Sequence, residues 1–131
     1  MRTRHIPMSD WGPSLDQFSR IHHGQPATVE SSAVDLGVQP NVRGLPLLGV
    51  TAEPRDPGPP EIQIMLGESP QTLVTHVVAD PTRVHLAEWN DDVSATLQIE
   101  SSDGTLTRVQ VGPASETLPE GFITDGFYRR L

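Results

Sequence analysis

The amino-acid sequence predicts a single, mainly β domain, borderline α+β, with one N-terminal helix. We expect a small antiparallel barrel or a curled meander sheet of about six to seven strands. Between Glu61 and Val111, short segments alternate apolar and polar residues, and a turn signal closes each segment, as half-buried strands do. The chain also has 13 prolines and 11 glycines, which argue against long helices and favour many turns.

The predicted helix covers residues 9–23. Ser9 or Asp10 can cap its N-terminus, and Gly24 stands where a left-handed C-terminal cap usually lies. Apolar residues recur at three- and four-residue spacing, which predicts that one side of the helix packs on the sheet. This stripe consists of Trp11, Leu15, Phe18 and Ile21 or His22.

The strands are predicted from apolar runs bounded by turn signals. Ser102–Thr105 is the strongest hairpin turn, because Asp-Gly supplies the positive φ that such turns need. Residues 35–44 and the proline-rich residues 53–60 are predicted to be irregular. The strand predictions are Gln25–Val34 (weak), Leu45–Thr51 (securest from Leu47), Ile62–Leu66, Leu73–Ala79, Arg83–Trp89, Ala95–Glu100 and Thr107–Val111.

Residues 1–120 are predicted to form the one domain, because domains commonly run to ~100–150 residues. Residues 121–131 form a C-terminal aromatic and basic tail that includes Phe122, Phe127 and Tyr128. We expect this tail to dock on its own domain, with a neighbouring subunit or a partner as the alternative.

Composition and charge exclude several classes of function. The chain has no cysteine and no lysine, so it can use neither thiolate chemistry nor a lysine Schiff base. The net charge of −8 repels phosphate backbones, which predicts no nucleic-acid partner. No apolar run follows Arg2 and Arg4, and no segment approaches the roughly 20 apolar residues of a membrane helix. We therefore expect a soluble, cytoplasmic protein with no membrane partner.

Two histidines are weak candidates for a metal site. If Asp80-Pro81 is the centre of a hairpin, His76 lies opposite His85, with Cβ atoms ~5 Å apart. A metal needs at least a third ligand, and none is fixed by the sequence. No Gly-x-Ser-x-Gly elbow, phosphate loop or catalytic carboxylate pair is present. The sequence therefore predicts no catalytic residue and no cofactor.

A series of short motifs carries a family resemblance. The motifs are Arg4-His5-Ile6-Pro7, Asp10-Trp11, Phe18-Ser19-Arg20, Leu45-Pro46-Leu47-Leu48-Gly49-Val50, Val74-Thr75-His76, Asp80-Pro81-Thr82-Arg83-Val84, Leu97-Gln98-Ile99-Glu100-Ser101 and Asp103-Gly104-Thr105. In their order and spacing, over about residues 2–120, they resemble the short bacterial proteins grouped as domain of unknown function 5335. The resemblance implies a small cytoplasmic bacterial protein. It brings no activity, cofactor or catalytic residue.

Three functions follow as hypotheses. The first is a non-enzymatic binding or protein-interaction module, with a protein partner or self-association, because catalytic constellations are absent. Its candidate contact residues are Trp11, Phe18, Phe122, Phe127 and Tyr128. The second is a small-molecule or metal binder that uses a face formed by His76 and His85. The third is an enzyme whose site is assembled entirely by tertiary contacts.

Overall fold

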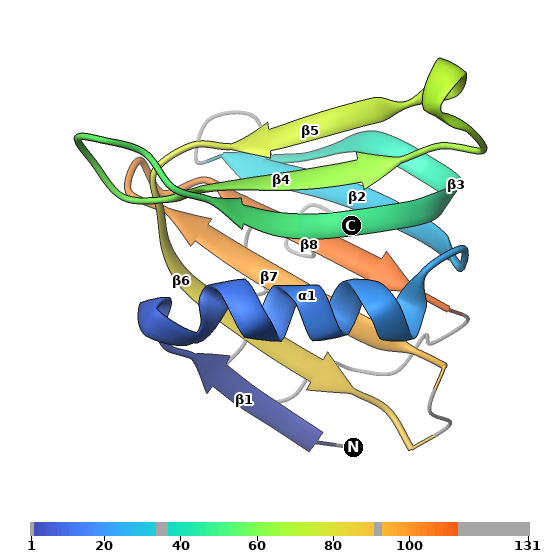
Figure 1. The fold of residues 1–131 in the computed structure, drawn as a ribbon, viewed down its shortest axis with the longest axis horizontal. Coiled ribbons are helices and arrows are strands. Elements are labelled where there is room, and N and C mark those ends of the chain that lie inside the picture. The colour runs from blue at the N-terminus through green and yellow to red at the C-terminus, as the bar shows by residue number, and fades with distance from the viewer. Residues whose placement is uncertain (1, 34–36, 91–92, 113–131) are drawn as a thin grey trace.

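The computed structural model describes residues 2–33, 37–90 and 93–112. These residues form one antiparallel sheet of eight strands, with one α-helix packed against it (Figure 1). The strands are β1 (Arg2–Ile6), β2 (Pro26–Ala33), β3 (Gly37–Glu53), β4 (Glu61–Leu66), β5 (Val74–Val78), β6 (Pro81–Glu88), β7 (Ala95–Ser101) and β8 (Leu106–Val111). The α-helix is α1 (Trp11–His22), and two 3₁₀ turns are η1 (Met8–Asp10) and η2 (Pro70–Thr72). The predicted mainly β class is confirmed.

The strands follow one another across the sheet in the order β1-β6-β7-β8-β2-β3-β4-β5. β1 and β5 are the two edges, so the sheet curls without closing and the barrel alternative is wrong. The meander predicted for residues 61–111 is also interrupted. β4 pairs with β5, and β6, β7 and β8 pair in sequence, but β5 and β6 belong to opposite parts of the sheet.

Two segments that are not predicted to be strands belong to the sheet. β1 is not among the predicted strands; four of its five side chains are exposed and only Ile6 is buried. It is nevertheless held along its whole length by β6, from Arg2 opposite Glu88 to Ile6 opposite Val84. Residues 37–44, predicted to be irregular, form the first half of β3 and pair with β2. Pairing with a distant strand therefore overrides the local signals in both segments.

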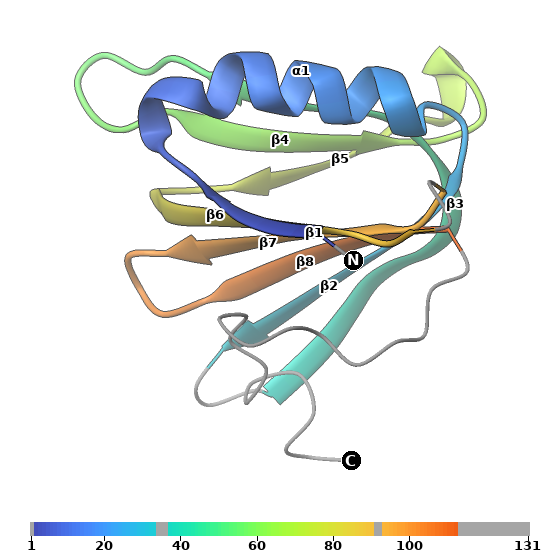
Figure 2. The same ribbon diagram turned by 90° about the horizontal axis from the view of Figure 1, so that it is seen from below.

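β3 is the longest strand, with 17 residues, and it joins two parts of the sheet. Its first half pairs with β2 as far as Pro46 opposite Pro26. From Leu47 to Glu53 it pairs with β4 instead. Figure 2 shows β3 running from the part of the sheet beside β2 to the part that contains β4. Over its second half, β3 has β4 on one side and α1 on the other.

α1 supplies hydrogen bonds to the side of β3 that β4 leaves unpaired. The backbone N–H of Val50 donates to the Ser19 hydroxyl at 2.8 Å. The same hydroxyl lies 2.9 Å from the Val50 carbonyl oxygen and 2.8 Å from the Leu15 carbonyl oxygen. After the helix, Gly24 N–H donates to the Leu47 carbonyl at 2.8 Å, and Leu47 N–H donates to the Gln25 carbonyl at 2.9 Å. The helix and its C-terminal loop thus replace a neighbouring strand.

The predicted apolar stripe of α1 faces the core. Trp11, Leu15, Phe18 and His22 are buried, whereas Ile21 is 51% exposed, which settles the choice between Ile21 and His22. The Trp11 indole N–H donates to the Ile6 carbonyl at 3.0 Å and so ties α1 to β1. Burial of these side chains stabilises the fold by roughly 1.5–3 kcal/mol for each large apolar group.

The N-terminal end of the helix differs slightly from the expected pattern, and the C-terminal end agrees with it. The α-helix begins at Trp11, because Met8–Asp10 form a 3₁₀ turn first, and the Asp10 side chain makes no capping hydrogen bond. Gly24 has φ +83°, as predicted for the residue that ends the helix.

The predicted turn between β7 and β8 is confirmed. Gly104 has φ +88°, and Thr105 N–H donates to the Asp103 carboxylate at 2.9 Å. This backbone hydrogen bond lowers the pKa of Asp103 below its ordinary value, because it stabilises the charged carboxylate.

We predict that Ser19→Ala lowers the free energy of unfolding by about 1–3 kcal/mol, because it leaves the buried Val50 N–H without an acceptor. The measurement is the urea unfolding midpoint by circular dichroism. Ser14→Ala is the matched control, since Ser14 is a half-buried serine in the same helix. Equal midpoints for the two variants would contradict the role given to Ser19.

Candidate functional site

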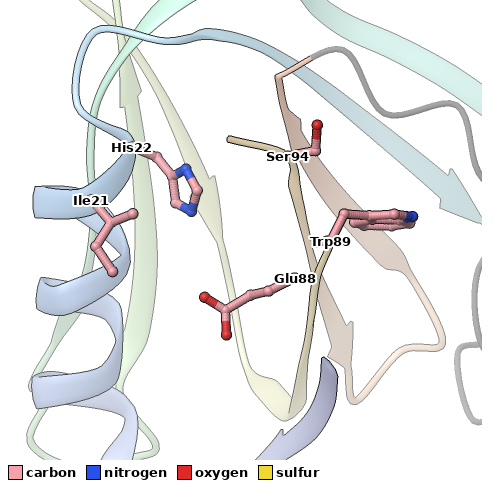
Figure 3. A pocket seen from close by; sticks show the side chains of 5 residues that line it. All are labelled: Ile21, His22, Glu88, Trp89 and Ser94. Carbon is pink, nitrogen blue, oxygen red and sulfur yellow. The ribbon is translucent and has the colours of Figure 1, made fainter. Parts of the chain in front are cut away.

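A pocket of about 170 Å³ lies between the last turn of α1 and the end of β6. It is lined by Ile21, His22, Glu88, Trp89 and Ser94 (Figure 3). His22 is the last residue of α1, and Glu88 is the last residue of β6. Trp89 N–H donates to the Ser94 carbonyl at 3.0 Å, which holds together the two ends of the connection to β7.

His22 contributes a buried imidazole to this pocket. The residue is 3% exposed, and its ring lies 4.7 Å from that of Phe18, measured between centroids. Nδ1 is 2.6 Å from the Gln25 side-chain oxygen. Because an amide oxygen can only accept, Nδ1 donates. Nε2 is buried and has no hydrogen-bond partner among the described residues, and Figure 3 shows the ring turned into the pocket.

Glu88 supplies a carboxylate to the same pocket. Its side chain extends from β6 toward α1 (Figure 3). One carboxylate oxygen accepts a hydrogen bond from the Arg2 guanidinium at 2.8 Å. This hydrogen bond, together with the negative charge of Glu88, raises the pKa of Arg2 above its ordinary value. The Arg2 side chain is 74% exposed, so solvent screens the ion pair.

The residue types around the pocket include those of a serine–histidine–carboxylate triad, but their arrangement differs from one. The Ser94 hydroxyl points away from His22 in Figure 3. His22 Nδ1 is bonded to the amide of Gln25, whereas a triad histidine is oriented by a carboxylate. Glu88 is bonded to Arg2 instead. The pocket therefore presents hydrogen-bond acceptors without an activated nucleophile.

The structure does not bring His76 and His85 together as predicted. β5 pairs with β4, which places His76 opposite Ile64. β6 lies between β1 and β7, so His85 is opposite His5 on one side and Gln98 on the other. The rings of His5 and His85 are 5.1 Å apart between centroids. The hairpin register across Asp80-Pro81 is wrong.

The tight connection between β5 and β6 explains this error. Asp80 has φ +48°, and the chain changes direction there instead of folding back on β5 (Figure 1). Pairing with β4 places Val78 opposite Ile62, and both side chains are buried in the core. Among the described residues, no group of three or more histidine, aspartate and glutamate side chains is placed to hold a metal ion.

The other candidate contact residues divide into two groups. Trp11 and Phe18 are buried in the core, in agreement with the packing expected for the helix stripe, so neither offers a surface to a partner. Phe122, Phe127 and Tyr128 lie outside the described residues.

Sequence reasoning missed the His22–Glu88 pocket. The sequence pointed to His22 only through its position in line with the apolar stripe of the helix. No sequence feature marked Glu88, which lies at the end of a strand.

Comparison with known proteins gives a family but no activity. The model of a family described as "Family of unknown function (DUF5335)" matches residues 2–119. An uncharacterized protein of Aquifex aeolicus is 27% identical over 120 residues, which cover 92% of this chain and all of the relative. The crystal structure of the Bacillus subtilis YojF protein aligns with a TM-score of 0.44 and 12% identity, over 90% of this chain and all of that one.

In the part of the chain that the structure describes, no helix has the length and apolar character to cross a membrane.

We predict that the free energy of unfolding falls as the pH drops through about 6.5, the ordinary histidine pKa. Burial lowers the pKa of His76. Burial, then the positive charges of His5 and Arg83, lower the pKa of His85 against the opposing charge of Glu100. Below the ordinary pKa, the unfolded chain therefore binds more protons than the folded one, which destabilises the fold.

The measurement is the urea midpoint at pH values above and below this range. His76→Gln and His85→Gln should each reduce the pH dependence of the midpoint. Thr75→Val is the control. It changes a neighbour of His76 and neither removes nor adds a titrating group, so the pH dependence should remain that of the unmodified chain. A pH dependence that neither histidine variant changes would show that other groups cause it.

Proposed function

The chain belongs to a family of unknown function, DUF5335, and from the geometry of its pocket we propose that it is a non-enzymatic binding module for a small ammonium ligand. The observation that carries the proposal is the Nε2 atom of His22, which is buried in the pocket wall without a hydrogen-bond partner among the described residues. An unsatisfied buried polar atom costs about 1–3 kcal/mol. A ligand N–H that donates to Nε2 removes this cost.

The charges around the pocket favour a cation. With Nδ1 donating to Gln25, the imidazole in its uncharged form presents a lone pair at Nε2. Glu88 adds a carboxylate. The pocket also lies against the last turn of α1, where the helix macrodipole is negative. The net charge of −8 raises the local concentration of cations further.

The size of the pocket limits the ligand. A protein cavity of about 150 Å³ accommodates benzene, so a pocket of about 170 Å³ has room for a molecule of similar size. Ile21 contributes apolar surface to its wall, and Trp89 also lines the pocket. A short alkyl chain that ends in a primary ammonium group fits both the volume and the lining.

The same geometry favours binding over catalysis. The Ser94 hydroxyl is turned away from the imidazole (Figure 3), so His22 is not placed to take a proton from it. Glu88 is engaged by Arg2 and is therefore arranged to hold a positive charge. These features support a site that holds a cation without transforming it.

We predict that n-butylammonium shifts the amide resonances of His22, Glu88 and Ser94 in ¹H–¹⁵N NMR spectra of the full chain. 1-Butanol, which has the same chain length without the charge, should shift them much less. Glu88→Gln should weaken n-butylammonium binding about tenfold, because a charge-assisted hydrogen bond is lost. Glu68→Gln is the control for charge, since Glu68 is exposed and does not line the pocket.

Arg2 gives a second variant that acts in the opposite direction. Arg2→Gln removes the guanidinium that competes for Glu88, so n-butylammonium should bind about twofold to fivefold more tightly. Arg4→Gln removes the same charge from an exposed position on the same strand and should leave the affinity nearly unchanged. Equal affinity for n-butylammonium and 1-butanol, or no effect of Glu88→Gln, would overturn the proposal.

A further inference from the structure

The two edges of the sheet differ in charge. Among the described strands, β1 and β5 each have a neighbour on one side only. The sequence of β1 is Arg-Thr-Arg-His-Ile, with both arginines exposed. The segment Leu73–Ala79, which contains β5, has no acidic or arginine side chain. Sheet edges are commonly protected from further pairing by charge, proline or bulges, and β5 has none of these features.

The β5 edge also exposes apolar surface. Leu73 is 44% exposed, Val74 39% and Val77 48%, and Thr75 between them is exposed as well. The opposite end of the strand is anchored, because Val78 is buried in the core opposite Ile62. β5 is therefore a fixed strand with an uncharged, partly apolar edge, which is the usual template for pairing with another strand.

We propose that β5 pairs antiparallel with β5 of a second copy of this chain, about a two-fold axis that passes beside His76. An isologous contact of this kind repeats each pair of residues twice, except at the axis, where His76 faces His76 once. In this register, Val74 faces Val78 of the second copy, and Thr75 faces Val77. The pairing extends each sheet into the sheet of the other copy and satisfies the free backbone groups of both edges.

The distribution of charge favours a second copy at this edge and not at β1. A chain of net charge −8 resists self-association through its charged surfaces, but no carboxylate or guanidinium group meets a like charge across β5, where the titratable pair is His76 opposite His76 at the axis. The same operation on β1 places Arg4 opposite Arg4, and like charges directly opposite each other destabilise a sheet.

The test is the molar mass of the full chain by light scattering over a range of concentrations. We expect twice the chain mass of 14.3 kDa. The double variant Thr75→Glu with Val77→Glu places acids opposite each other twice and should reduce the mass to that of the monomer. The double variant Thr75→Lys with Val77→Glu places opposite charges there instead and should remain a dimer. Both positions are exposed, and circular dichroism checks that each variant folds.

The outcomes separate the proposal from other modes of association. A monomer at every concentration overturns it. A dimer that survives the double glutamate variant places the contact elsewhere in the chain, and a monomeric Thr75→Lys, Val77→Glu variant overturns the register.

Hydrogen exchange of the unmodified chain tests the same contact without a variant. The β5 amides that point away from β4 should exchange more slowly as the protein concentration rises, and concentration-independent exchange overturns the proposal.

Discussion

The structure depends on how the second half of β3 satisfies its hydrogen bonds. From Leu47 to Glu53, this strand has β4 on one side and a helix on the other, and a helix has no free ladder of backbone groups to offer. Buried backbone N–H and C=O groups are almost always paired. One hydroxyl, that of Ser19, reaches Val50, and the loop at Gly24 and Gln25 reaches Leu47. These few bonds fix where α1 lies on the sheet.

The pocket is a consequence of the same loop. The backbone carbonyl of Gln25 accepts the Leu47 N–H, while the side chain of Gln25 accepts the His22 Nδ1–H. A single residue thus joins the strand edge to the imidazole and sets the direction in which Nε2 points. Glu88 arrives from β6, on the far side of the pocket, where β1 brings Arg2 beside it. Structural and binding roles therefore share residues, and changes at Gln25 affect both.

Sequence reasoning succeeded where a structural signal is local. The helix stripe from Trp11 to His22 and the Asp103-Gly104 turn are set by spacing and by backbone conformation, and both were found. It failed where distant pairing decides. β1 has almost no apolar pattern because only Ile6 is buried, and the strand after Asp80-Pro81, β6, pairs with the distant β1 and with β7 instead of folding back on β5. Glu88 could not be assigned to the site, since only the tertiary fold brings it near His22.

The pairing of β1 with β6 also constrains how the chain folds. Arg2 and Glu88 are 86 residues apart in sequence, and β2 pairs with β8, the last described strand. β1 must therefore wait for a partner from the far part of the chain, and β2, which pairs first with β3, must wait for its second partner. Because contacts of long sequence separation slow folding, we expect milliseconds to seconds for this domain. During synthesis at about 5–20 residues per second, β1 and β2 leave the ribosome several seconds before β6 and β8, with which they pair, are made.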